Sequence, residues 1–189
     1  MHLRRLPAIT LKPMAALARA VERLVADVAV VGASAAGLSA ARAAACEGAR
    51  VVLLERRPEI GLPEAPAAVA FQFLWTASEA PPDACVRRRL DGVRLRSPGG
   101  YALEVQAPLV VLDRVAYDRH LARGAEEAGA RVVAGVRGLG VRDDRTLAAE
   151  GLEVSAKVVV FADGARTLAA RFLRPVRHPE GLTWGAAQR

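Results

Sequence analysis

The sequence of 189 residues contains few aromatic residues, two cysteines and three histidines. Aromatic side chains make up only 4% of the chain, so its arginines lack the stacking surface that single-stranded nucleic acids require. The formal net charge is +7, and the arginines are spread along the chain. This distribution favours a solvated basic surface over a nucleic-acid-binding protein.

The two cysteines and the short apolar runs exclude further classes. Cys46 and Cys85 form neither a disulfide framework nor a set of metal ligands, and no apolar run is long enough to cross a bilayer. Met1 to Ala26 lacks the continuous apolar core of a secretory signal. These absences predict a cytoplasmic protein without a metal site. Cys46 lies in a predicted helix, where we expect a small, buried side chain.

The segment Met14 to Val25 has apolar residues at helical spacing and follows a basic stretch. It could be an amphipathic helix on a membrane surface, which would allow peripheral membrane contact. The favoured interpretation is an extension from an early start codon or a helix packed on the domain. The residues alone leave these alternatives open.

The most informative stretch is Asp27 to Arg57, with the sequence DVAVVGASAAGLSAARAAACEGARVVLLERR. Its apolar run Val28 to Val31 predicts a strand, and an alanine-rich helix follows and ends at Gly48. A second strand, Val51 to Leu54, leads into Glu55. Strand, glycine turn, helix, strand and acid in this order are typical of the βαβ unit that binds the ADP half of a dinucleotide.

The turn of this unit runs from Gly32 through Ser34 and Ala36 to Gly37. Gly32 permits a tight reversal from strand to helix, and Gly37 lets the helix approach the sheet. The first N–H groups of the helix would then point at a pyrophosphate, which the helix dipole also favours. Ser34 occupies the middle position of the G-x-G-x-x-G pattern, and its hydroxyl could donate to a phosphate oxygen.

The acid at the end of the second strand predicts which nucleotide this unit prefers. Glu55 can accept the two ribose hydroxyls of an adenosine, which favours FAD or NAD over a cofactor with a 2′-phosphate. Arg56 and Arg57 follow directly and weaken that preference.

The rest of the chain predicts further strands and one long helix. Pro98-Gly99-Gly100 lies between two alternating segments and predicts a β-hairpin. Asp113 is a suitable N-cap for a helix that continues to Ala128 and is closed by Gly129. The remaining expected strands are Arg131 to Ala134, Gly138 to Val141, Leu152 to Ser155 and Lys157 to Phe161.

Three segments resemble the FAD-dependent oxidoreductases of the glutathione-reductase-like class. The resemblance is greatest to the geranylgeranyl reductase family, which is related to the aromatic hydroxylases. These segments are DVAVVGASAAGLSAARAAACEGARVVLLERRPEIG, VLDRVAYDRHLARGAEEAGARVVAGVRGLGV and VVVFADGARTLAAR. The resemblance implies an α/β fold: a Rossmann-like FAD/NAD(P)-binding domain with a parallel sheet and an inserted β-hairpin or meander.

The same resemblance implies roles for residues outside the first unit. Arg114 would reach the FAD phosphates, for which its fork of donors is suited. Gly138 would pass close to the adenine. Asp163 and Gly164 would lie near the pyrophosphate, where the family also receives NAD(P)H. FAD is therefore the expected cofactor and NAD(P)H the expected reductant.

The sequence departs from this family in two ways. Geranylgeranyl reductases usually carry a cysteine and glycines after the P-E-I-G-x-P segment, whereas Glu64 to Val69 contains neither. In addition, the later Gly-Asp motif and the substrate domain of the family have no counterpart. We therefore expect an N-terminal extension at 1–26, an FAD-binding domain at 27–175, and the start of an incomplete substrate domain at 176–189.

Three functions remain open at this stage. The first is a reductase of carbon–carbon double bonds that acts on a small molecule, either isoprenoid or aromatic. The second is an FAD-binding fragment without catalysis, and the third is a flavin-dependent aromatic monooxygenase. No catalytic acid or base can be named, because His120 and His178 are isolated in the sequence. The oligomeric state is not predicted.

Overall fold

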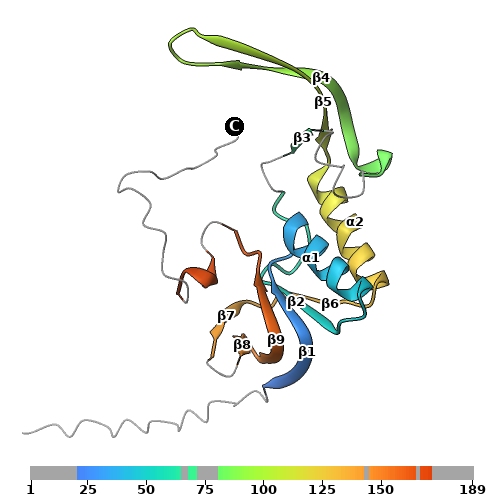
Figure 1. The fold of residues 1–189 in the computed structure, drawn as a ribbon, viewed down its shortest axis with the longest axis vertical. Coiled ribbons are helices and arrows are strands. Elements are labelled where there is room, and N and C mark those ends of the chain that lie inside the picture. Colours follow the sequence, from blue (N-terminus) through green and yellow to red (C-terminus); the bar gives the residue numbers. More distant parts are fainter. Residues whose placement is uncertain (1–20, 65–67, 72–80, 143–144, 165–166, 172–189) are drawn as a thin grey trace, which may run out of the picture.

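A computed structural model describes residues 21–64, 68–71, 81–142, 145–164 and 167–171 (Figure 1). The described chain alternates strands and helices around one main sheet. The strands and helices, in chain order, are β1 (Glu22–Val31), α1 (Ala35–Cys46), β2 (Val51–Glu55), β3 (Val69–Phe71), η2 (Asp83–Cys85), β4 (Val86–Arg96), β5 (Ala102–Leu112), α2 (Arg114–Glu127), β6 (Arg131–Ala134), β7 (Gly138–Val141), β8 (Thr146–Ala149), β9 (Leu152–Phe161) and η3 (Leu168–Arg171).

The main sheet has six strands in the order β6-β2-β1-β9-β8-β7. Strands β6, β2, β1 and β9 run parallel, whereas β8 and β7 are added by antiparallel pairing. This arrangement confirms the predicted α/β fold with a parallel sheet. The carboxyl ends of all four parallel strands meet at one edge, which is where such sheets bind ligands.

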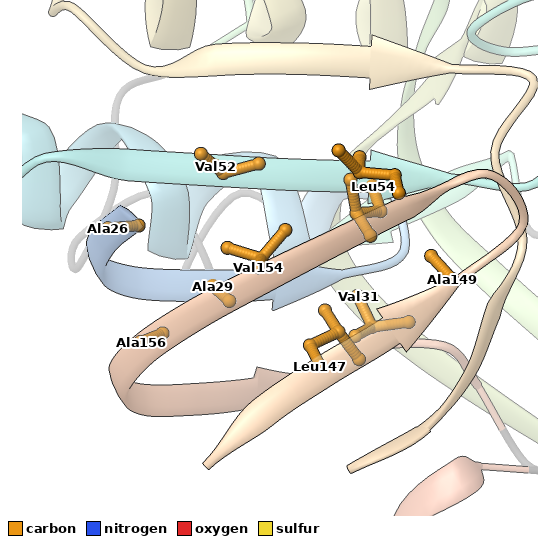
Figure 2. Packing of buried hydrophobic residues seen from close by; sticks show 10 residues of the cluster. Ala26, Ala29, Val31, Val52, Leu54, Leu147, Ala149, Val154 and Ala156 are labelled. Carbon is orange, nitrogen blue, oxygen red and sulfur yellow. The ribbon is translucent and has the colours of Figure 1, made fainter. Parts of the chain in front are cut away.

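Alternation along β2 shows how the sheet buries both of its faces. Val51 and Leu53 contact the helical side, together with Leu38 of α1. Val52 and Leu54 point to the opposite side, where they join residues of β1, β8 and β9 (Figure 2). Because the side-chain period of a strand is two, a continuous apolar run such as VVLL supplies two cores at once.

The helices α1 and α2 lie side by side over one face of the sheet (Figure 1). Ala41 and Ala45 of α1 are buried in the same cluster as Ala122 and Ala125 of α2. Small side chains at these positions allow the two helices and the sheet to approach closely. The predicted N-cap of α2 is confirmed, because the carboxylate of Asp113 accepts a hydrogen bond from the Ala116 backbone N–H at 2.9 Å.

The second sheet has three strands in the order β3-β5-β4, and β4 and β5 form the predicted hairpin. The strands are longer than the alternating segments expected on either side of Pro98. Near α2 the hairpin is anchored by Cys85, Val110, Leu112 and Tyr117, which share one buried cluster. Its far end extends away from the rest of the described structure (Figure 1).

Two predicted strand boundaries were wrong. The first strand begins at Glu22 rather than Val28, because Glu22 to Ala26 pairs in register with Leu152 to Ala156 of β9. The end of the segment expected to be helical therefore lies in a strand, and residues 1–20 of the extension lie outside the described residues. On the other side of this pairing, the two strands expected between Leu152 and Phe161 form one continuous strand, β9.

Strand β8 (Thr146–Ala149) was not predicted, and it returns to β9 through an antiparallel turn. The burial expected for Cys46 was also wrong, since its side chain is exposed at the end of α1. Ala45 faces the sheet, and the next residue along a helix points about 100° away from it. Asp143, Asp144 and the segment 176–189 lie outside the described residues.

Candidate functional site: a cleft at the carboxyl ends of the parallel strands

A cleft of about 450 Å³ opens where β1, β2 and β9 end. This volume is within the range typical of small-molecule sites. Its walls come from the turn after β1, the end of β2, the loop before β7 and the segment after β9. The sequence-predicted residues that line it are Gly32, Ser34, Glu55, Arg56, Gly138, Asp163 and Gly164.

The turn after β1 requires glycine at both of its ends. Gly32 has a φ of +102°, and a Cβ there would lie 2.5 Å from the carbonyl oxygen of Ala162. A Cβ on Gly37 would lie 1.8 Å from the carbonyl oxygen of Gly32. Both distances are well below contact distance, so the absence of a side chain lets β1, α1 and the segment after β9 come together. Gly37 therefore shapes the turn without lining the cleft.

The amino terminus of α1 faces this cleft and is suited to an anion. Ser34 is the N-cap residue, and its side chain makes no capping hydrogen bond within the described residues. The first turn of α1 carries no acidic residue of its own, and the positive end of the helix dipole faces the cleft. A phosphate group placed here would meet backbone N–H donors, the dipole and the Ser34 hydroxyl.

The carboxylate of Glu55 connects the glycine turn to the loop after β2. Its Oε2 accepts a hydrogen bond from the Ala33 N–H at 2.8 Å, and its Oε1 accepts one from the Arg57 N–H at 2.9 Å. These bonds fix the orientation of the carboxylate at the cleft wall. An ionised carboxylate has about four acceptor sites, so capacity remains for ligand hydroxyls. The ribose contact of Glu55 stays a prediction.

Asp163 presents a further acceptor at the cleft. Its Oδ2 accepts a hydrogen bond from the Leu168 N–H at 2.6 Å, which holds the start of η3. Its Oδ1 is buried and has no hydrogen-bond partner among the described residues. A buried acceptor without a donor is costly unless a ligand or water supplies one. This acceptor and the glycine turn together fit the binding of a dinucleotide such as FAD.

Gly138 closes the cleft from the other side and is buried. A Cβ on this residue would lie 3.2 Å from Cδ1 of Leu168, a residue that also lines the cleft. The glycine therefore leaves space at this wall. Its predicted proximity to an adenine stays a prediction.

Arg114 is not part of the cleft surface. Its Nη2 donates to Oδ1 and Oδ2 of Asp118 at 3.1 and 3.3 Å, and the exposed fractions of the two side chains are 12% and 5%. Asp118 does line the cleft. Burial raises the pKa of Asp118, while its ion pair with Arg114 opposes that shift. The ion pair is therefore largely buried, with Asp118 in the cleft wall and Arg114 behind it.

Within the described residues, no helix is long and apolar enough to cross a membrane. The same residues contain no cluster of three or more histidine, cysteine or acidic side chains able to hold a metal ion.

A protein-family model described as FAD dependent oxidoreductase matches residues 27–166. The chain belongs to this family. The predicted resemblance is confirmed by a relative that is 34% identical over 161 residues, digeranylgeranylglycerophospholipid reductase 1 of Methanothermobacter thermautotrophicus. The match covers 77% of this chain and 41% of the relative, so the chain spans less than half the length of that protein.

Solved structures resemble this chain in the same way. A geranylgeranyl bacteriochlorophyll reductase-like protein from Thermoplasma acidophilum is 28% identical with a TM-score of 0.67, over 72% of this chain and 38% of that one. Aklavinone-11 hydroxylase, solved with FAD and aklavinone, is 26% identical with a TM-score of 0.55, over 78% of this chain and 34% of that one.

The sequence predicted several of the residues that line the cleft, but not all of them. Ala36, Gly37 and Arg114 were predicted to bind the cofactor and do not line the cleft, whereas the side chain of Asp118 does. Asp118 stands four residues after Arg114 in the quoted DRVAYD segment, so that spacing could have indicated the pair. Arg137 also lines the cleft and carried no sequence signal. The cofactor roles of all these residues stay predictions.

Proposed function

We propose that this chain is the FAD-binding part of an oxidoreductase that uses NAD(P)H to reduce carbon–carbon double bonds of an isoprenoid lipid. The observation that carries the proposal is the glycine turn facing a cleft in a chain similar to a digeranylgeranylglycerophospholipid reductase. FAD, when bound, supplies two-electron hydride chemistry. For each double bond that is reduced, NAD(P)H would provide a hydride by way of FAD, and solvent would provide a proton.

The residues of this chain would hold and orient the cofactor. The amino terminus of α1, with Ser34, would bind the pyrophosphate. Glu55, fixed by the backbone N–H groups of Ala33 and Arg57, would accept the hydroxyls of the adenosine ribose. Asp163 would accept a hydrogen bond at its buried Oδ1. Catalytic residues are not assigned.

The proposal is tested first by binding. Titration of the purified protein with FAD, followed by flavin fluorescence, should show saturable binding of one FAD per chain. Glu55→Gln should weaken it by about tenfold or more, because a hydrogen bond to a charged group contributes about 1.5–3 kcal/mol. Glu47→Gln is the matched control, since Glu47 is exposed at the opposite end of α1. Absence of FAD binding by the unmodified protein would refute the proposal.

The reaction is tested second. The FAD-loaded protein is mixed without oxygen with NADH or NADPH, and then with a lipid carrying geranylgeranyl chains. The expected result is bleaching of the visible absorption of the flavin, followed by a mass gain of two hydrogens per double bond in the lipid. Flavin that is never reduced by either nicotinamide would indicate a binding module without catalysis.

A flavin-dependent monooxygenase is the second candidate, favoured by the similarity to aklavinone-11 hydroxylase. A monooxygenase needs oxygen, whereas the proposed reductase acts without it. NAD(P)H oxidation would require both oxygen and an aromatic substrate, and the product would gain one oxygen atom. Reduction of the lipid in the absence of oxygen excludes this candidate.

A further inference from the structure

The wall of the cleft contains four acidic side chains, although the ligand proposed for it is an anion. They are Glu55, Glu59, Asp118 and Asp163. Glu59 is exposed, and Glu55 and Asp163 are partly exposed, so water screens their charges. Asp118 is only 3% exposed, and a charge that water does not reach acts most strongly on its surroundings. Asp118 is therefore the acid whose charge most affects an anionic ligand in this cleft.

The cation that faces Asp118 is Arg114, one helical turn earlier on α2. Its Nη2 lies 3.1 and 3.3 Å from Oδ1 and Oδ2 of Asp118. The side chain of Arg114 is 12% exposed, and it does not line the cleft, whereas Asp118 does. The positive charge of the pair therefore lies behind the cleft wall, and the negative charge lies in it.

The first turns of α2 are held in place by the loop after β2. A Cβ on Gly61 would lie 3.0 Å from Cα of Val115, so the loop packs directly against the start of the helix. The Arg119 side chain of α2 donates to the carbonyl oxygen of Ile60 at 3.4 Å and to the Glu59 carboxylate at 3.3 Å. These contacts hold α2 in one orientation relative to the cleft.

Charged groups at the end of β2 also act on Asp118. Burial raises the pKa of Asp118, whereas its pairing with Arg114 lowers it. The charge of Arg57 lowers this pKa further, and the charge of Glu55 raises it. Glu55 in turn accepts a hydrogen bond from the Ala33 N–H of the glycine turn at 2.8 Å. Asp118 therefore shares its electrostatic environment with the turn expected to bind the pyrophosphate.

We propose that Arg114 assists pyrophosphate binding through Asp118, by cancelling the charge of that carboxylate in the cleft wall. Arg114 is then a positioning residue that does not itself contact the cofactor. This role rests on the proposed function, because the pyrophosphate is that of FAD. A direct contact of Arg114 with the phosphates, which the family resemblance implies, predicts a different response to substitution.

The test is the affinity of the purified protein for FAD, followed by flavin fluorescence, and for ADP, followed by calorimetry. Arg114→Met keeps most of the length of the side chain and removes its charge, so binding of both nucleotides should weaken about tenfold. Arg114→Met/Asp118→Leu should bind within about threefold of the unmodified protein. Neither methionine nor leucine can donate a hydrogen bond to a phosphate, so this recovery would come from removal of the carboxylate charge.

A third variant separates the charge of the pair from its contribution to the fold. Asp118→Asn keeps the shape of the side chain and removes its charge, so FAD should bind as tightly as to the unmodified protein or up to about tenfold more tightly. Each single variant leaves one buried partner of the pair uncompensated, so both should lower the melting temperature. The two substitutions therefore change stability in the same direction but differ in their effect on affinity.

The pH dependence of binding checks the same role. In Arg114→Met, Asp118 keeps Glu55 and Arg57 as neighbours but loses its own cation, so its pKa should rise further. Protonation of Asp118 on acidification removes its charge, and the loss of FAD affinity in this variant should shrink between about pH 8 and about pH 6. Arg114→Met/Asp118→Leu retains Glu55 and Arg57, and its affinity should follow the pH dependence of the unmodified protein.

Arg131→Met is the matched control for the loss of one arginine from an ion pair. Arg131 is exposed and lies 2.9 Å from the carboxylate of Glu22. The two residues stand at the amino ends of β6 and β1, at the opposite edge of the sheet from the cleft. The FAD affinity of this variant should equal that of the unmodified protein.

Two results would overturn the role of Arg114. One is a double variant that binds as weakly as Arg114→Met, which would show that Arg114 contacts the phosphates. The other is an equal loss of affinity in Arg114→Met and Asp118→Asn, which would show that the pair only maintains the fold. The proposed function fails separately: ADP binding without FAD binding would refute it, and the ADP affinities of the variants would still decide the role of Arg114. Binding of neither nucleotide would refute both.

Discussion

The cleft edge of the main sheet and the distal hairpin, Gly92 to Gln106 of β4 and β5, differ in how far their apolar residues are buried. At the cleft, four parallel strands end together, and the chain packs so tightly that Gly32 and Gly37 have no room for a methyl group. In the distal hairpin, two antiparallel strands pair with each other and leave Leu95 and Leu103 exposed. Both regions contain apolar strand residues, but only the strands of the main sheet bury most of theirs within the described chain.

The apolar pattern of a strand predicts that it forms a strand, but whether its side chains are buried depends on the elements that cover its faces. In β2 the sheet covers both flanks of the strand, and α1 together with β8 and β9 covers its two faces. In the distal hairpin nothing in the described chain covers either face. The first region therefore forms a cleft of the size typical of small-molecule sites, whereas the second leaves an apolar face exposed within the described residues.

The largest expected effect lies at the closest approach in the cleft. Gly37→Ala would place a Cβ 1.8 Å from the Gly32 carbonyl oxygen, which cannot move without opening the turn after β1. We expect a loss of more than about 4 kcal/mol in the free energy of unfolding and loss of FAD binding. Urea unfolding and flavin fluorescence measure the two effects.

Gly124→Ala is the matched control for this substitution, because Gly124 is also helical. A Cβ there would meet the Arg42 side chain at 3.5 Å, an ordinary contact distance. The same chemical change should leave stability unchanged or raise it by up to about 1 kcal/mol, since alanine is the better helix former. Equal losses in both variants would show that the close approach at Gly37 is not what makes glycine necessary.

A pair of identical substitutions compares the two regions directly. Leu53→Ala removes a side chain with no exposed surface and should cost about 2–5 kcal/mol. Leu95→Ala removes a side chain that is 54% exposed, and its cost should be within about 0.5 kcal/mol. Urea unfolding at one pH gives both values. A cost for Leu95→Ala as large as that for Leu53→Ala would mean that the distal hairpin is covered in solution.

Local signals in the sequence predicted the first part of the fold well. The glycine turn, the alanine-rich helix and the Asp113 cap each depend on residues within a few positions of one another. The start of β1 could not be found in this way, because Glu22 to Ala26 becomes a strand by pairing with β9, more than a hundred residues away. Strand propensity is weak where pairing partners decide the structure.

The same distinction applies to the candidate site. Glu55 could be predicted from its place at the end of a strand, and Asp163 from the family resemblance, and both line the cleft. The i,i+4 spacing of Arg114 and Asp118 could have indicated their ion pair, but which of the two lines the cleft depends on how α2 packs against the sheet. The presence of Arg114 in a familiar segment indicated a cofactor contact, whereas the geometry shows a buried pair whose acid reaches the cleft.

The smallest expected effect lies at the end of β2 opposite the cleft. Asp27 accepts hydrogen bonds from the Arg50 side chain at 3.1 Å and from its backbone N–H at 3.0 Å, and Lys157 lies 2.8 Å away. These contacts, with the Arg50 side chain contributing most, hold the pKa of Asp27 well below its usual value of 3.8. The charged form is thereby favoured in the folded state.

A depressed pKa in the folded state fixes how Asp27 contributes to stability. The contribution is fully present above the unfolded value of 3.8 and is lost as the pH falls toward the lower folded value. Asp27→Asn should therefore destabilise the protein by a constant amount at neutral pH, and the difference should shrink below about pH 4. Melting temperatures between pH 7 and about pH 3 measure it. Asp91→Asn, at an exposed acid in the hairpin, is the control for the loss of one carboxylate from the surface. A difference between Asp27→Asn and the unmodified protein that grows on acidification would contradict the pairing of Asp27 with Arg50 and Lys157.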